Sequence, residues 1–164
     1  MGEYQIQIYE EYSGTLVQSL GCTGETVVIP NFTAEELCCP LTYKASFRAG
    51  FLNKLKMFRK GLGVPMEVNS CARSEKHNAI VGGHNNSLHL IENPKWQTLG
   101  CEAIDIDMNG KSVHYINECM KLATKFNLSV GVGWKVKNNR GVGFMHLDDR
   151  TQAIGLPRTI FYYK

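Results

Sequence analysis

The chain has 164 residues and a formal net charge of +3, and 43% of its residues are hydrophobic while 20% are charged. This length suits one domain with a core of its own, and the composition excludes the disordered and low-complexity classes. The net charge is too small to indicate a nucleic-acid partner, so we expect none.

Features of membrane insertion and export are missing from the sequence. No apolar run approaches the roughly 20 residues of a membrane span, so we expect no membrane partner. The opening MGEYQIQIYEEY lacks the basic and then apolar layout of a signal peptide, which predicts synthesis in the cytoplasm without one. The six cysteines contain no C-x-x-C pair, and in this setting they indicate buried or reduced thiols rather than disulfides or metal ligands.

The first thirty residues have the pattern of short strands. Residues 5–9 alternate polar and apolar side chains, and residues 26–29 form a β-branched run. We therefore predict an N-terminal β extension over residues 1–30, followed by a domain over residues 31–164. A contact of the extension with another copy or with a virion is one alternative, and the oligomeric state stays open.

Two helices are predicted in the next segment. Thr33 and Glu36 in NFTAEEL form a capping box, which predicts a short helix that stops before Pro40. A longer helix is predicted where apolar residues recur at helical spacing, and Gly61 and Gly63 indicate its end. The apolar residues of this stripe are Phe47, Phe51, Leu55, Phe58 and Leu62.

The second half of the chain alternates predicted strands with a helix. Residues 75–86 form a long loop rich in Gly, Asn, Ser and His, and loops of that length are often functional. Residues 112–126 have the pattern of an amphipathic helix. Strands are predicted within residues 64–73, 101–108, 128–136 and 141–149, the last two around an Asn-Asn-Arg turn. The order of elements predicts an α+β fold with helices packed on a small antiparallel sheet.

Two of these strands carry side chains that bind metals. Asp105 and Asp107 share one strand face, and so do His146 and Asp148, because side chains alternate along a strand. Such groups cost several kcal/mol to bury alone, so they should be paired, solvated or bound to a metal. His89 is the natural third candidate, and a His, His, Asp set leaves a fourth zinc position open for water, as in catalytic sites. Hydrogen-bonded structural histidines and aspartates in turns remain open alternatives.

The order of the motifs resembles the zinc D-alanyl-D-alanine carboxypeptidase family, whose fold is shared with the hedgehog signalling domain. The resemblance runs from residue 31 to about residue 150. It rests on NFTAEELCCP, FRKGLGVPMEV, NSCARSEKHNAIVGGHNNSLHL, AIDI, GVGW and GFMHLDDR. This implies a hedgehog/DD-peptidase-like fold and a bound zinc ion as cofactor.

The resemblance also implies roles for individual residues. His89, Asp105 and His146 would be the zinc ligands, the same types of residue that the strand pattern proposes. Ser87 would orient the first ligand through its hydroxyl. Arg73 would bind a substrate carboxylate or stabilise the developing oxyanion.

Two further residues are candidates of lower rank. His77 belongs to the family's His-Asn pair, and we expect it to structure the loop or to contact substrate. Trp134, in GVGW, is expected to form a wall of the cleft or to pack in the core.

The chain departs from the family pattern at two places. The segment between the first two ligands is longer than in the family and carries Pro94 and Trp96, so it should bulge beside the cleft and shape or cover it. Many relatives have an acid three residues before the last histidine, and here that position is Gly143. The general base must then lie elsewhere, or the site performs no hydrolysis.

Three carboxylates are candidates for that base. Asp148 is the first choice because it shares a face with His146, while Asp107 and Glu102 are weaker choices. Asp148 would equally well serve only to accept a hydrogen bond from a ligand histidine.

The functional expectation is a hydrolase, a zinc metallopeptidase that cleaves D-Ala-type bonds of peptidoglycan stem peptides as a carboxypeptidase or an endopeptidase. The lack of a signal peptide suits cell-wall degradation by a phage endolysin or a virion-associated hydrolase, which reaches the wall after phage-mediated release or as a virion component. The alternative is a non-catalytic, zinc-stabilised binding module of the same fold, which Gly143 favours.

Overall fold

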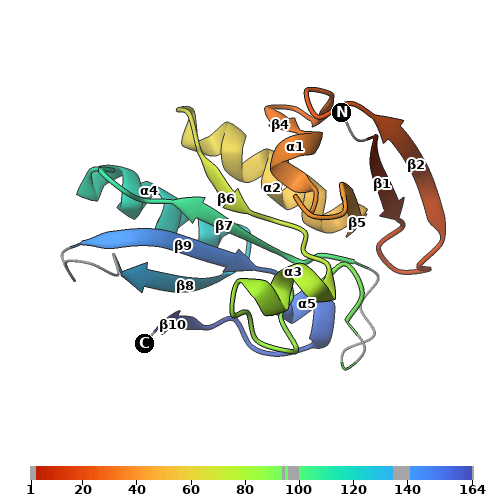
Figure 1. Cartoon of the computed structure of the whole chain (residues 1–164). Helices are drawn as coiled ribbons and strands as arrows, with labels where there is room; N and C mark the ends of the chain where they lie inside the picture. The colour runs from red at the N-terminus through yellow and green to blue at the C-terminus, as the bar shows by residue number, and fades with distance from the viewer. Residues whose placement is uncertain (1–2, 94, 96–99, 135–140, 164) are drawn as a thin grey trace.

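The structure is a computed structural model that describes residues 3–93, 95, 100–134 and 141–163. Pro94, Trp96 and the predicted Asn-Asn-Arg turn lie outside these residues. The elements are labelled in Figure 1 and follow in the order β1 (Tyr4–Tyr9), β2 (Leu16–Cys22), β3 (Val27–Ile29), β4 (Phe32–Thr33), α1 (Ala34–Leu37), β5 (Lys44–Arg48), α2 (Ala49–Leu62), β6 (Val68–Ser70), α3 (Glu75–Ile80), β7 (Ala103–Asp107), α4 (Val113–Lys125), β8 (Ser129–Trp134), β9 (Val142–Asp148), α5 (Arg150–Ile154) and β10 (Ile160–Tyr162).

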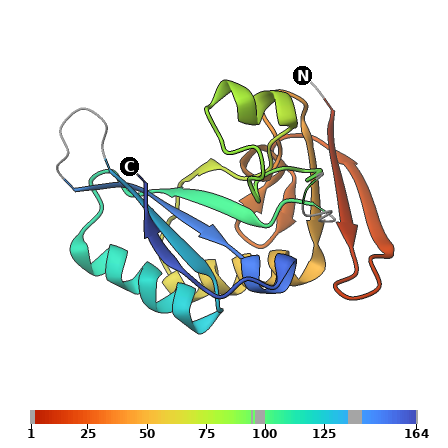
Figure 2. The ribbon, with the colours of Figure 1, turned by 90° about the horizontal axis from the view of Figure 1, so that it is seen from below.

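A five-stranded sheet in the order β10-β8-β9-β7-β6 occupies the centre of the fold. Its pairs are antiparallel except for β10 with β8, which is parallel. Helices α2 and α4 lie on one side of the sheet and α3 on the other, as Figure 2 shows. The predicted α+β class, with helices on a small and mainly antiparallel sheet, is confirmed.

The two faces of this sheet differ in chemistry because side chains alternate along each strand. The face toward α2 and α4 is apolar and belongs to the hydrophobic core, with Ile104, Ile106, Val130, Met145 and Leu147 fully buried. The opposite face carries Asp105, His146 and Asp148. The alternation of apolar and polar residues along these strands therefore separates the core from the polar site.

The helix starts follow local capping chemistry. Thr33 caps α1 as predicted, because its Oγ1 accepts from the backbone N–H of Glu36 and the Glu36 carboxylate accepts from the backbone N–H of Thr33. The end of α2 is also as predicted at Gly63, which has a φ of 68°. Gly61 lies inside α2, where a Cβ would approach Leu122 of α4 to 2.6 Å. It lets the two helices pack closely and does not end the helix.

Phe47 corrects the predicted start of the longer helix. This residue lies in β5, and α2 begins only at Ala49. β5 pairs in parallel with β1, where Phe47 lies beside Ile8, so sheet hydrogen bonds decide its conformation rather than the helical spacing of its side chain.

The predicted loop over residues 75–86 contains the short helix α3. Ser74 caps this helix, since its hydroxyl accepts from the backbone N–H of His77. One turn and a half shows too little apolar periodicity to be recognised in a sequence. By contrast α4 follows the prediction closely, with Ser112 as its N-cap.

The N-terminal residues form a second sheet in the order β2-β1-β5. Its strand β1 is antiparallel to β2 and parallel to β5. Ile6 is fully buried and belongs to the same hydrophobic cluster as Phe47 and Ile104. The division at residue 30 stays a prediction, but the core runs across it. None of the helices within the described residues is long and apolar enough to span a bilayer.

Candidate metal centre

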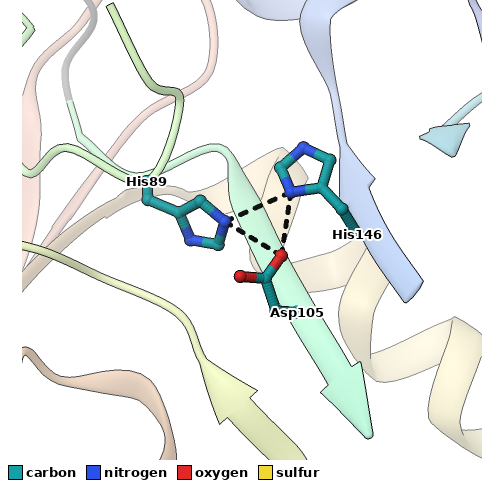
Figure 3. Close-up of side chains that lie close together, drawn as sticks. All are labelled: His89, Asp105 and His146. Atoms are coloured by element: carbon teal, nitrogen blue, oxygen red, sulfur yellow. Dashed lines mark hydrogen bonds and ion pairs between the residues drawn. The ribbon is translucent and has the colours of Figure 1, made fainter. Parts of the chain in front are cut away.

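His89, Asp105 and His146 converge at the polar face of the central sheet (Figure 3). Asp105 of β7 and His146 of β9 lie directly opposite each other in the strand register. His89 arrives from the segment between α3 and β7, where the next residue, Leu90, forms an isolated bridge with Arg73. All three side chains are almost completely buried.

The spacing of the three donor atoms suits one metal ion. His89 Nε2 lies 3.1 Å from Asp105 Oδ1 and 3.2 Å from His146 Nδ1, and the last two atoms are 2.9 Å apart. Ligands of a tetrahedral ion at about 2.0 to 2.1 Å lie about 3.3 Å from one another. Two imidazole nitrogens and one carboxylate oxygen are also the donor types that zinc prefers.

The tautomer of His89 follows from its second hydrogen bond. His89 Nδ1 lies 2.6 Å from the carbonyl oxygen of Cys71, which can only accept, so Nδ1 carries the proton and Nε2 keeps its lone pair for a metal. Ser87 contacts the main chain instead of the ring, since its Oγ accepts from the backbone N–H of His89 at 3.2 Å. The Cys71 carbonyl was not expected, because a backbone acceptor leaves no signal in the sequence.

His146 is oriented by a carboxylate that is itself held by an arginine. His146 Nε2 donates to Asp148 Oδ2 at 2.8 Å, which leaves Nδ1 free to bind a metal. Arg150 donates to both carboxylate oxygens of Asp148, at 2.8 Å from Nε and 2.7 Å from Nη2. Arg150 is absent from the predicted site, although its two-residue distance from Asp148 could have indicated it.

Arg73 lies beside the centre and contacts a candidate ligand. Its Nη2 donates to Asp105 Oδ2 at 2.6 Å, and its Nε donates to Ser70 Oγ at 2.7 Å. Asp105 therefore turns one oxygen to the two histidines and the other to Arg73. This arrangement fixes the carboxylate and brings a guanidinium to the edge of the site.

The charges of the centre favour the metal-binding forms of Asp105 and His89, but they favour the protonated form of His146. Burial would raise the pKa values of Asp105 and Asp148, but His89 and His146 hold that of Asp105 well below its usual range, and Arg150 and His146 do the same for Asp148. Burial lowers the pKa of His89. Burial has the same effect on His146, but the two carboxylates outweigh it and raise its pKa to about 9.

A cavity of about 600 Å³ opens above the three residues. Phe144, Phe161 and Tyr163 form an aromatic part of its lining, while Arg73 and Arg150 contribute positive charge. The other lining residues include Val81, His84, Asn86, Ser87, Leu88, Lys95, Ile154 and Leu156. The candidate metal centre is thus accessible to a ligand of peptide size.

Comparison with protein-family models gives a match to the peptidase M15 model over residues 30–148. The chain belongs to the peptidase M15 family. Searches of curated proteins and of solved structures gave no match. Membership confirms the resemblance to the zinc D-alanyl-D-alanine carboxypeptidase family and supports a zinc-dependent metallopeptidase.

The candidate bases of this M15 peptidase lie in different surroundings. Asp107 is hydrogen-bonded to Asn109, and Glu102 is buried against Arg48; neither lines the cavity. Asp148 lines it, but His146 and Arg150 already engage both its oxygens. The geometry therefore favours the orienting role over the general-base role that the sequence also allowed.

Two other sequence candidates of the M15 peptidase are His77 and Trp134. His77 belongs to α3 and is not among the residues that line the cavity, and its Nδ1 is buried with no hydrogen-bond partner in the described chain. Trp134 ends β8, but its side chain lies outside the described residues. Neither the expected cleft wall at Trp134 nor the bulge at Pro94 and Trp96 is tested.

Proposed function

We propose that the chain is a zinc-dependent peptidase that hydrolyses peptidoglycan stem peptides at D-Ala-type bonds, as a carboxypeptidase or an endopeptidase. The observation that carries this proposal is the convergence of His89, Asp105 and His146, with donor atoms at most 3.2 Å apart, on the floor of a peptide-sized cavity. Membership in the peptidase M15 family supports hydrolysis rather than metal storage or structural binding.

The residues around the centre each have a defined part in this reaction. His89, Asp105 and His146 would hold the zinc, which when bound polarises a carbonyl and lowers the pKa of water. Asp148 and Arg150 keep the His146 ring in place, so that little reorganisation is needed during turnover. Arg73 holds Asp105 and presents positive charge to the substrate.

The charge of the cavity supports an anionic substrate. The two carboxylates in its lining, Asp105 and Asp148, are each paired with an arginine, so a zinc ion held there would leave the lining positively charged. Stem peptides of peptidoglycan carry carboxylates, and a positively charged lining would attract these groups. We propose that they are the partner of this site.

We further propose that the protein acts at the cell wall, as a phage endolysin or a virion-associated hydrolase. Purified protein added to peptidoglycan sacculi should release peptide fragments without a membrane-bound partner. Intact sacculi after prolonged incubation with zinc-loaded protein would contradict this role.

The first test combines metal analysis with a digestion assay. We expect about one zinc per chain and, by mass spectrometry, peptide products from purified peptidoglycan that disappear when a chelator is added. His89→Ala and His146→Ala should each lose both zinc and turnover. The matched control is His114→Ala. His114 is exposed on α4, which lies on the side of the sheet opposite to the polar face that carries Asp105 and His146. Full turnover in a metal-free His89→Ala protein would overturn the proposal.

The second candidate function is a zinc-stabilised binding module without catalysis. Gly143 favours it, since the acid of many relatives is missing there and Asp148 is fully hydrogen-bonded. One zinc per chain with binding to peptidoglycan but no peptide product at any pH would select this module over the peptidase.

A further inference from the structure

The C-terminal strand β10 brings aromatic side chains to the candidate metal centre, although it lies beyond residues 30–148, which match the family model. β10 pairs in parallel with β8, and the backbone N–H of Tyr163 continues this pairing by donating to the Val132 carbonyl at 3.0 Å. Because side chains alternate, Phe161 and Tyr163 point to the same face of the sheet as His146.

The Tyr163 ring occupies a defined position beside His146. Its centroid lies 5.2 Å from that of Phe144, 5.4 Å from that of Phe161 and 6.1 Å from that of His146. The contact with His146 is edge-on, with an interplanar angle of 76°. Three rings therefore fix the phenol next to a candidate ligand.

Gly131 of β8 makes room for this arrangement. It lies opposite His146 in the strand register. A Cβ at Gly131 would come within 2.6 Å of the Phe161 ring and 2.7 Å of the Tyr163 ring. Any residue with a side chain at Gly131 would therefore clash with both rings.

The phenol of Tyr163 remains a hydrogen-bond donor at neutral pH. An unperturbed phenol has a pKa of about 10, so the hydroxyl is protonated at neutral pH. Tyr163 lines the cavity, and its hydroxyl has no hydrogen-bond partner in the described part of the chain. A protonated phenol among the charged groups of the centre is therefore available to a ligand.

We propose that Tyr163 is a catalytic residue whose hydroxyl donates a hydrogen bond to the carbonyl oxygen of the scissile bond as that oxygen gains negative charge. This inference rests on the proposed function and assigns a residue to that same site. Arg73 uses Nη2 and Nε on Asp105 and Ser70, so the phenol is a donor in addition to the remaining N–H groups of Arg73. A fixed donor at the site of developing charge stabilises the transition state without reorganisation.

The decisive variant is Tyr163→Phe, which keeps the ring and removes only the hydroxyl. We expect kcat on released stem peptides to fall by about 10²-fold, as for loss of an oxyanion donor, while KM and zinc content change little. The matched control is Tyr12→Phe, because Tyr12 is 87% exposed in the turn between β1 and β2. A kcat within twofold of wild type, or an effect confined to KM, would overturn the inference.

A second readout does not depend on turnover. Inorganic phosphate is tetrahedral and anionic, like the adduct formed during hydrolysis, so its oxygens should accept the same hydrogen bond. We expect the cobalt-loaded wild type to bind phosphate at least about tenfold more tightly than Tyr163→Phe, measured by ³¹P line broadening, which corresponds to one charge-assisted hydrogen bond. Equal affinities, or no binding by wild type, would overturn the inference.

The two readouts separate the inference from the proposed function. A wild type that binds phosphate through Tyr163 but releases no peptides would leave the role of Tyr163 intact and contradict the substrate. If wild type and Tyr163→Phe cleave stem peptides at the same rate, the proposed peptidase function stands, but Tyr163 has no part in the chemistry.

Discussion

At the scale of single residues, the metal centre depends on hydrogen bonds that lie outside the three candidate ligands. The Cys71 carbonyl sets the tautomer of His89, and Asp148 sets that of His146. Each of these acceptors is itself held. The peptide group of the Cys71 carbonyl is held by its N–H, which belongs to Ala72 and donates to the Leu37 carbonyl at 3.1 Å, and Asp148 is held by Arg150. The ligand geometry is therefore prepared before a metal binds.

Asp148→Asn distinguishes an orienting carboxylate from a general base. We expect the amide to orient His146 less well and to weaken zinc binding by about 10- to 100-fold, measured by competition with a chelator. Turnover at saturating zinc should then recover in part. The control is Asp107→Asn, since Asp107 contacts Asn109 and not the cavity. Unchanged zinc affinity with complete loss of turnover would instead identify Asp148 as the base.

Glu102 predicts a pH dependence of stability. Burial raises its pKa from 4.5 to about 8, although the Arg48 guanidinium opposes the shift. The folded chain thus binds the proton of the Glu102 carboxyl more tightly than the unfolded chain does. The contribution of this proton to the free energy of unfolding is complete below pH 4.5 and is lost as the pH rises through 8.

Glu102→Gln tests this sign, because glutamine does not titrate. Between pH 4.5 and pH 8, the free energy of unfolding of wild type should fall relative to Glu102→Gln by a few kcal/mol, at about 1.4 kcal/mol per pKa unit. Denaturant titrations of the two zinc-loaded proteins measure the difference. A gap that stays constant over this range would show that Glu102 keeps its usual pKa in the fold.

At the scale of elements, local signals predicted a helix well where a cap and an apolar stripe coincide. α4 has both, with Ser112 as its N-cap and Cys119 and Ala123 buried. β5 was missed because its pairing with β1, more than thirty residues away, overrides the helical spacing of Phe47. α3 was missed because six residues carry a cap but almost no periodicity.

The cap of α4 gives a prediction at this scale. Ser112 Oγ accepts from the backbone N–H of Tyr115 at 3.1 Å, so Ser112→Ala should lower the free energy of unfolding by about 1 kcal/mol. Ser112→Asp should retain the cap and stability. Both variants should keep zinc and turnover, because α4 covers the apolar face of the sheet and the metal centre lies on the opposite face. Equal unfolding of Ser112→Ala and wild type would contradict the role of this cap.

At the scale of the whole molecule, the N-terminal sheet and the central sheet share one hydrophobic core. β1 supplies Ile6 to this core and pairs with β5, which leads directly into α2. Removal of residues 1–30 would leave β5 without its partner strand and would open the core. The N-terminal segment is thus expected to stabilise the fold, in addition to any contact it makes with other molecules.

Two neighbouring substitutions in β1 test this coupling. Ile6→Ala should lower the free energy of unfolding of the entire protein by about 2 to 5 kcal/mol, because Ile6 is fully buried. Gln5→Ala, one residue away on the exposed face, should change it by about 0.5 kcal/mol or less. Loss of only a local transition in Ile6→Ala, with the metal site unfolding at the wild-type midpoint, would indicate two independent units.

The sequence by itself determined the family motifs, the helices α1 and α4 and the alternation that places Asp105 and His146 on polar strand faces. These features depend on residues within a few positions of one another, so they are readable without a fold. The family resemblance already named Asp105 as the aspartate that meets the histidines, and the tertiary structure supplied the physical reason, which is the register of β7 against β9. Only the tertiary structure decided the contacts of Arg150, the Cys71 carbonyl and Tyr163, because segments far apart in the chain meet only when the core packs.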